Sequence, residues 1–199
     1  MPAEDRAALK QILRELSIRT GDFVLASGKR SNLYIDARLT TCHARAMPLI
    51  GRAFLDKMDE LGWRPAAVGG LTMGADPIAI AIARESLERA GEPINAFVVR
   101  KEPKAHGMKQ GVEGLALQAR IDVVVVDDVC STGGSTVTAV ERARDAGLNV
   151  LGAICLVDRK LGAAGNLANI QCPFASIFEI GELVESGTES PAQAESLPH

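Results

Sequence analysis

The sequence is poor in aromatic residues, cysteine and histidine. Only 4% of its 199 residues are aromatic, with one Trp and one Tyr, and it holds four Cys and three His. Cys42, Cys130, Cys155 and Cys172 form no C-x-x-C pair, and the histidines are equally scattered. This spacing signals neither a structural zinc site nor a disulfide framework, so we expect reduced and mostly buried thiols.

A large excess of one charge and long apolar runs are also missing. The 22 Lys and Arg against 25 Asp and Glu leave a net charge of -3, which argues against a basic surface for nucleic acid. No uncharged apolar run reaches about 18 residues, so no membrane span is expected. The first residues, MPAEDRAALKQIL, carry acids where a secretory signal would carry bases and an apolar block. We therefore predict a cytoplasmic protein.

Several common nucleotide and hydrolase motifs are absent. The chain has no G-x-x-x-x-G-K-[ST] and no G-x-G-x-x-G after a strand, which argues against nucleoside triphosphatases and dinucleotide-binding proteins. Ser135 lies in GGSTV, without the closing glycine of a serine-hydrolase elbow. A phosphate site in this chain must therefore be of another kind.

The apolar pattern predicts an α/β protein. Near the start it favours a helix over 4–16, a hairpin with strands at 23–25 and 33–35, and a second helix over 43–61. Strands and helices then alternate: strands at 66–69, 95–99, 121–126 and 150–157, and helices at 75–90 and 133–146. Continuous apolar strands separated by helices indicate a parallel sheet that is covered on both faces.

The length favours a single domain. We divide it into an N-terminal part of about 1–42, a core over 43–160 and a C-terminal segment over 161–199. From Glu179 onward the chain holds five Glu and no Lys or Arg, which is typical of a solvated acidic tail.

The stretch VVVVDDVCSTGGST, residues 123–136, is the strongest functional signal. Four buried valines lead into Asp127 and Asp128, and a Gly-Gly turn rich in hydroxyls then opens a helix. Ligands of open parallel sheets bind beyond the carboxyl ends of the strands, and free amides at a helix start favour phosphate. The two acids suit a sugar diol together with Mg2+. We therefore predict a site for a phosphorylated sugar.

A second polar stretch, RKEPKAHGMKQGVEG at 100–114, follows the predicted strand at 95–99. It combines five cationic or imidazole side chains with one proline and three glycines. A segment of about 15 residues without secondary structure is typical of a lid. We interpret it as a cationic lid that closes over a polyanionic substrate.

Together these stretches resemble the type I phosphoribosyltransferases and, more narrowly, their orotate branch. VVVVDDVCSTGGST resembles the family's motif for 5-phosphoribosyl-1-diphosphate (PRPP), and RKEPKAHG resembles the catalytic loop of the orotate branch. FVLASGKRSNLYID is similar to the N-terminal hood hairpin of that branch, and GGLTMGADPIA to its pyrophosphate loop. LVDR, at 156–159, is similar to the strand end that faces the base.

The resemblance implies a phosphoribosyltransferase-like sheet with a small hood. The implied reaction is Mg2+-dependent transfer of the phosphoribosyl group from PRPP to orotate, which gives orotidine 5′-monophosphate and pyrophosphate in pyrimidine synthesis. It also implies a homodimer in which the loop over 100–114 reaches the neighbouring subunit's site. Mg2+ would be held mainly through PRPP, and Asp127 and Asp128 could add contacts through water.

The same resemblance assigns the site residues. The implied catalytic residues are Lys101, Lys104, His106 and Asp128. PRPP binding is implied for these four and for Thr72, Met73, Gly74, Arg100, Asp127, Val129, Cys130, Ser131, Thr132, Gly133, Gly134, Ser135 and Thr136. Orotate binding is implied for Tyr34, Ile35, Ser131 and Arg159, and Lys29 is a further candidate.

The chain departs from the family pattern at two positions. Many bacterial members carry lysines where this sequence has Ala26 and Gly74. Two alternatives share the PRPP motif: a purine phosphoribosyltransferase, and a PRPP-binding regulator without catalytic activity. The regulator would usually show a basic surface or a DNA-binding extension, and residues 1–42 offer neither clearly.

Overall fold

The centre of the molecule is a six-stranded sheet with the order β5-β4-β3-β6-β7-β8. The computed structural model describes residues 1–24, 30–102, 111–116 and 121–184. The strands of this sheet are β3 (Ala67–Leu71), β4 (Asn95–Val99), β5 (Val112–Glu113), β6 (Asp122–Cys130), β7 (Asn149–Asp158) and β8 (Phe174–Glu179). All neighbouring pairs are parallel except β4 and β5. The predicted α/β class is confirmed, with one antiparallel strand at an edge.

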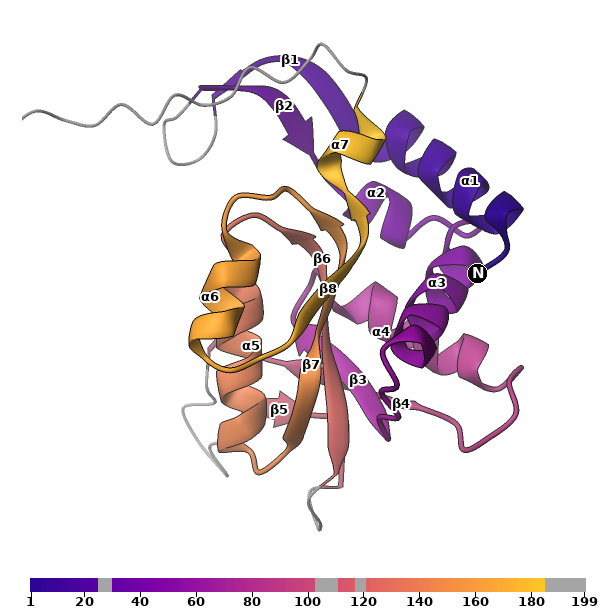
Figure 1. Cartoon of the computed structure of the whole chain (residues 1–199), viewed down its shortest axis with the longest axis vertical. Helices are drawn as coiled ribbons and strands as arrows, with labels where there is room; N and C mark the ends of the chain where they lie inside the picture. Colours follow the sequence, from indigo (N-terminus) through magenta and orange to yellow (C-terminus); the bar gives the residue numbers. More distant parts are fainter. Residues whose placement is uncertain (25–29, 103–110, 117–120, 185–199) are drawn as a thin grey trace, which may run out of the picture.

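Helices cover both faces of this sheet (Figure 1). The helical elements are α1 (Ala3–Ile12), the π-helical turn η1 (Leu13–Ser17), α2 (Arg38–Thr41), α3 (Met47–Glu60), α4 (Asp76–Ser86), α5 (Gly134–Asp145), α6 (Ala163–Asn169) and α7 (Ile180–Leu183). Figure 1 shows α3 and α4 on one side of the sheet and α5 and α6 on the other. None of the helices in the described ranges is long and apolar enough to cross a membrane.

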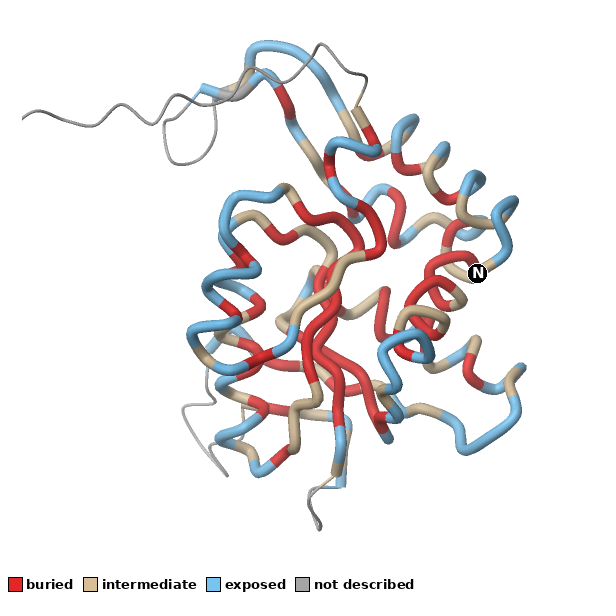
Figure 2. The backbone as a smooth tube through the Cα atoms, in the orientation of Figure 1, coloured by how far each residue is buried: buried red, intermediate tan, exposed pale blue. Residues whose placement is uncertain are grey.

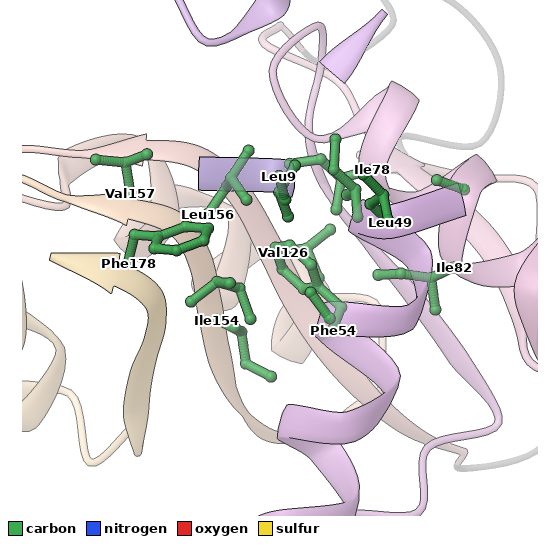
Figure 3. Packing of buried hydrophobic residues seen from close by; sticks show 14 of the residues in the cluster. Leu9, Leu49, Phe54, Ile78, Ile82, Val126, Ile154, Leu156, Val157 and Phe178 are labelled. Carbon is green, nitrogen blue, oxygen red and sulfur yellow. The ribbon is translucent and has the colours of Figure 1, made fainter. Parts of the chain in front are cut away.

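The alternating valines of β6 divide the core into two layers. Val124 and Val126 belong to the cluster that includes Leu9, Phe54 and Ile78 from α1, α3 and α4 (Figure 3). The alternate valines, at 123 and 125, belong to the cluster on the α5 face. Neighbouring strand residues point to opposite faces, so both faces of β6 are apolar and covered. Figure 2 shows the resulting buried centre.

The N-terminal hairpin is a separate two-stranded sheet. Its strands, β1 (Ile18–Val24) and β2 (Arg30–Ile35), pair antiparallel with a register shift between Thr20 and Phe23. Both strands are longer than the sequence pattern predicted. The hairpin leads directly into α2, which the pattern missed because four residues are too few to show helical periodicity.

Four other sequence predictions need correction. The strand predicted to end at 126 continues to Cys130, so the two acids lie within β6 rather than after it. The stretch over 100–114 is not free of secondary structure, because β5 pairs with β4 at its far end. The second long helix begins at Met47 rather than at residue 43, and α4 ends at Ser86 rather than at residue 90.

The C-terminal segment also contains elements that the sequence pattern did not predict. It contributes α6, β8 and α7, and β8 lies beside β7 as an edge strand. Glu179, where the acidic tail was predicted to begin, instead forms a capping box with Glu182 at the start of α7. Residues 185–199 lie outside the described residues. The acidic residues at 179 and 182 are therefore structural.

Candidate functional site

The turn after β6 leaves a helix start open for an anion. Gly133 precedes α5 in the left-handed region with φ of 79°, and no side chain of the described residues caps the first amides of this helix. A Cβ on Gly133 would lie 3.2 Å from Cα of Ala163, so the position favours glycine in both backbone angle and space. Asn166 holds the turn from α6 through a hydrogen bond from its Nδ2 to the carbonyl oxygen of Thr132, at 2.9 Å. Uncapped amides at a helix start are suited to phosphate.

Asp127 fastens this turn to the strand. Its Oδ2 accepts hydrogen bonds from the hydroxyls of Ser135 and Thr136, both at 2.7 Å, and its Oδ1 accepts one from the amide of Asp128. The carboxylate is buried. Sequence reasoning gave this acid to the ribose hydroxyls, and that role stays a prediction. In the structure this carboxylate anchors the start of α5 to β6, a role that the sequence analysis missed.

Asp128 points to the other face of β6, because adjacent strand residues alternate. It lies against the loop that follows β3, where a Cβ on Gly74 would be 2.7 Å from its Oδ1. Burial and the neighbouring charge of Asp127 raise the pKa of Asp128 to about 6, while the Arg38 guanidinium acts in the opposite direction. A carboxyl with this pKa changes charge near neutral pH, which is common at functional sites.

The loop after β3 brings a second set of predicted residues to the same edge. Met73 is exposed, and Thr72 donates a hydrogen bond from its hydroxyl to Oδ2 of Asp76, at 2.6 Å. Within the described ranges, Oδ1 of Asp76 is buried and makes no hydrogen bond. The loop thus presents backbone at Met73 and Gly74 toward Asp128, and Asp76 orients the side chain of Thr72.

The cationic segment after β4 is described only at its two ends. Arg100 donates a hydrogen bond from its amide to the carbonyl oxygen of Gly111, and its guanidinium pairs with Glu113 at 2.8 Å. Lys101 is exposed. Lys104 and His106, which sequence reasoning placed in the catalytic group, lie outside the described residues. Because β4 is parallel to β3, and β3 to β6, the segment leaves the sheet at the same edge as the loops after β3 and β6.

The residues predicted to hold the base come from two places. Tyr34 is on β2, 43% exposed, with its ring centroid 5.6 Å from that of Phe23. Arg159 follows β7, and its amide donates to the carbonyl oxygen of Cys130, which places it beside the turn that contains Ser131. Ile35 is half-buried, and Lys29 lies outside the described residues. The hood thus provides one group of base-binding candidates and the sheet edge provides the other.

Not all residues of the predicted PRPP motif expose side chains. Cys130 is buried, with its sulfur 3.0 Å from the hydroxyl oxygen of Thr136, and burial raises the pKa of its neighbour Cys155 well above the usual value. Val129 packs against the core. Any contact of Val129 or Cys130 with a ligand would therefore be through the backbone.

Sequence reasoning missed one charged pair close to these groups. Arg38 donates two hydrogen bonds to Asp36, from Nε to Oδ1 at 2.8 Å and from Nη2 to Oδ2 at 3.0 Å. These bonds lower the pKa of the Asp36 carboxyl. A separation of two residues matches no helical pairing, so the sequence gives no signal for this contact.

An uncapped helix start follows the acidic strand β6 at the edge of a parallel sheet, and a glycine loop lies opposite the second acid of that strand. The family model of the phosphoribosyl transferase domain matches residues 41–169. The orotate phosphoribosyltransferase of Corynebacterium glutamicum is 44% identical over 181 residues, which are 91% of this chain and 95% of the relative. That of Aquifex aeolicus is 42% identical and covers 90% of this chain and 98% of its own. The chain belongs to the orotate phosphoribosyltransferases, a branch of the phosphoribosyltransferase family.

Solved structures agree with this assignment. The orotate phosphoribosyltransferase of Mycobacterium tuberculosis in complex with PRPP has a TM-score of 0.74 and 37% identity, and the match covers 90% of this chain and 98% of that one. The adenine phosphoribosyltransferase of Leishmania donovani matches with a TM-score of 0.60 at 18% identity, which shows a shared fold only.

Proposed function

We propose that this protein transfers the 5-phosphoribosyl group from PRPP to orotate, with orotidine 5′-monophosphate and pyrophosphate as products, as a step of pyrimidine synthesis in the cytoplasm. The observation that carries the proposal is that β3, β4 and β6 are parallel and end at one edge of the sheet, where Gly74 of the loop after β3 lies against Asp128 of β6. The named relatives at 42% identity or more support orotate as the base. All four cysteines are free thiols, as suits the cytoplasm.

Each loop would bind one part of the substrate. The amides of Gly134 and Ser135 at the start of α5 are suited to the 5-phosphate, and Asp128 to the ribose hydroxyls. The loop at Thr72, Met73 and Gly74 lies across from Asp128, where backbone groups could bind the pyrophosphate. Tyr34 and Arg159 would hold the base, with Arg159 suited to its carboxylate by planar pairing.

The residues suit the charge that develops during transfer. As the bond between C1 of the ribose and the pyrophosphate oxygen breaks, its electron pair leaves with the pyrophosphate and the sugar becomes cationic, as in glycoside cleavage. A ring nitrogen of orotate then bonds to C1 and loses its proton. Ionised Asp128 would stabilise the cationic sugar, and Lys101, Lys104 and His106 would stabilise the leaving pyrophosphate.

The carboxylate oxygens at the end of β6 are suited to an Mg2+ ion that the substrate also coordinates. Both oxygens of the Asp127 carboxylate accept hydrogen bonds from the chain, whereas Asp128 accepts one at Oδ1 from the amide of Val129. Mg2+ usually keeps several waters and is held by one or two carboxylates together with substrate phosphates. When bound, it would neutralise charge on the pyrophosphate, and Asp128 would contact it directly or through water.

A panel of bases tests the proposal. Purified protein with PRPP and Mg2+ should form nucleotide from orotate, and not from adenine, hypoxanthine or uracil. Omission of Mg2+ should abolish the reaction. Product from a purine alone would favour the purine enzyme, and bound PRPP without product from any base would favour the regulator.

We also propose a homodimer in which the loop over 100–114 acts in the partner's site. Mixing Lys104→Ala subunits with Asp128→Ala subunits tests this directly. If the loop acts on the partner, each mixed dimer regains one intact site that combines Asp128 of one subunit with Lys104 of the other. Activity that stays near that of the parent variants after subunit exchange would reject the shared site.

A further inference from the structure

The short helix α2 presents one arginine on an otherwise anchored turn. Thr40 and Thr41 are fully buried, and the hydroxyls of Thr40 and Ser17 are 2.6 Å apart. The amide of Asp36 donates to the carbonyl oxygen of Ser17 at 2.9 Å. Arg38, on the outer side of this turn, keeps 50% of its side chain exposed. The backbone under Arg38 is thus fixed, while its guanidinium remains accessible.

Asp36 holds the guanidinium in a defined orientation. The two parallel bonds to Nε and Nη2 occupy one edge of the group. Nη1 makes no hydrogen bond to the described part of the chain. Bidentate pairing fixes the geometry of the guanidinium. The Arg38 side chain is therefore already ordered, and a ligand that binds it causes a smaller loss of side-chain entropy.

Arg38 lies within electrostatic range of both halves of the site. The pKa of Arg38 is raised mainly by Asp36, and further by Asp128 of the sheet and Tyr34 of the hood. In turn its charge lowers the pKa of Asp128. Figure 1 shows α2 between the hairpin and the sheet edge at which β6 ends, so Arg38 comes from an element near both the acid proposed for the ribose and the ring proposed for the base.

The negative charge of orotate makes a cation at the position of Arg38 useful for binding. Orotate is an anion, and it must approach an edge that already carries Asp127 and Asp128. Among the other cations of the described part near that edge, Arg100 pairs with Glu113 and Lys160 with Glu179, and Arg159 is already assigned to the carboxylate of orotate. Resting on the proposed function, we propose that Arg38 is a substrate-binding residue whose free Nη1 edge donates to an anionic oxygen of orotate between Tyr34 and Asp128.

The substitution Arg38→Gln tests this with a neutral side chain of similar reach. A lost hydrogen bond to a charged group should raise the KM for orotate about tenfold to a hundredfold. At a pH well above the pKa of Asp128, where that carboxylate stays ionised even without the Arg38 charge, the KM for PRPP should change less than about twofold, because Arg38 is assigned to the base. In the reverse reaction the KM for orotidine 5′-monophosphate should rise and that for pyrophosphate should stay. Arg38→Lys, which keeps the charge, should recover part of the loss.

Two controls separate binding from folding. Arg84→Gln removes an exposed arginine of α4 whose ion pair among the described residues is with Glu88, and its kinetics should match the wild type. Asp36→Asn weakens the hold on Arg38 and should shift the KM for orotate in the same direction by less. Thermal unfolding of every variant shows whether the fold is intact.

The outcomes distinguish this inference from the function on which it rests. Failure of the wild-type protein to use orotate would reject the proposed function. An active wild type with an unchanged KM for orotate in Arg38→Gln would reject only the role of Arg38. Equal rises in the KM values for PRPP and orotate would also reject it, because they would indicate a general disturbance of the site.

Discussion

Gly74 leaves room for Asp128: a Cβ at Gly74 would lie 2.7 Å from Oδ1 of Asp128 and 2.9 Å from its Cγ. Oδ1 is also held by the amide of Val129 at 2.8 Å, so the carboxylate cannot move away without losing that bond. The contact joins the loop after β3 to the strand end of β6. In this chain a side chain at residue 74 would therefore disturb the positions proposed for both the pyrophosphate and the ribose.

We predict that Gly74→Ala lowers kcat/KM for PRPP about 100-fold, because a shift of about 1 Å in a reacting group has an effect of that size. Steady-state kinetics with varied PRPP would measure it. Gly165→Ala is a matched control on α6, where a Cβ meets nothing within 4 Å, and it should leave kinetics unchanged. Wild-type kinetics in Gly74→Ala would contradict the assigned contact.

The anchor at Asp127 predicts a cost in stability when its partner is removed. Thr136→Val keeps the side-chain shape and deletes the hydroxyl that donates to Oδ2 of Asp127. We expect unfolding free energy to fall by about 1 to 3 kcal/mol, as for lost hydrogen bonds to charged groups, and the KM for PRPP to rise. Denaturant unfolding and kinetics would measure the two effects.

The control for this variant is Thr138→Val on the same helix. The exposed hydroxyl of Thr138 donates to the carbonyl oxygen of Gly134, four residues earlier. Its removal should cost less than about 1 kcal/mol. Equal losses in the two variants would mean that the bond between Asp127 and Thr136 has no special role.

The raised pKa of Asp128 predicts a trade between stability and activity. Its pKa in the folded protein, about 6, exceeds the ordinary value of 3.8. The stability linked to the protonated form is therefore complete below about pH 4 and is lost as pH rises through 6. Asp128→Asn should be more stable than wild type at pH 7.5, by at most about 3 kcal/mol, and the difference should vanish near pH 4.

The same variant should lose activity. Without the carboxylate, turnover should fall about 100-fold or more. In the wild type, kcat/KM for PRPP should decrease below about pH 6 as Asp128 takes up a proton. Unfolding curves at several pH values and a pH-rate profile measure both effects. A variant that is less stable than wild type at pH 7.5 would contradict the unfavourable burial of this charge.

The sheet, and the glycine turn between β6 and α5, could be predicted from the sequence because both follow from strong local patterns. Four consecutive valines require burial on both faces of a strand, and the glycine turn after them requires a helix start. The roles of the two acids could not be separated in this way. Their difference depends on the continuation of β6 through Asp127 and Asp128, which turns one toward the hydroxyls of α5 and the other toward Gly74.

The sequence patterns did not predict contacts between segments that are far apart along the chain or that lack regular secondary structure. The strand β8 was not predicted from the sequence, and its position in the sheet is set by its pairing with β7. The pair of Asp36 and Arg38 forms at a turn whose geometry depends on the bond between Ser17 and Thr40. Such tertiary effects override local preference.

The central claim is that the turn after β6 holds the 5-phosphate of PRPP while Asp128 faces its ribose. A crystal structure of the protein with PRPP and Mg2+ measures this most directly. The account predicts the 5-phosphate against the amides at 131–136 and the ribose hydroxyls within hydrogen-bonding distance of Asp128. PRPP bound at another place, with this turn empty, would contradict it.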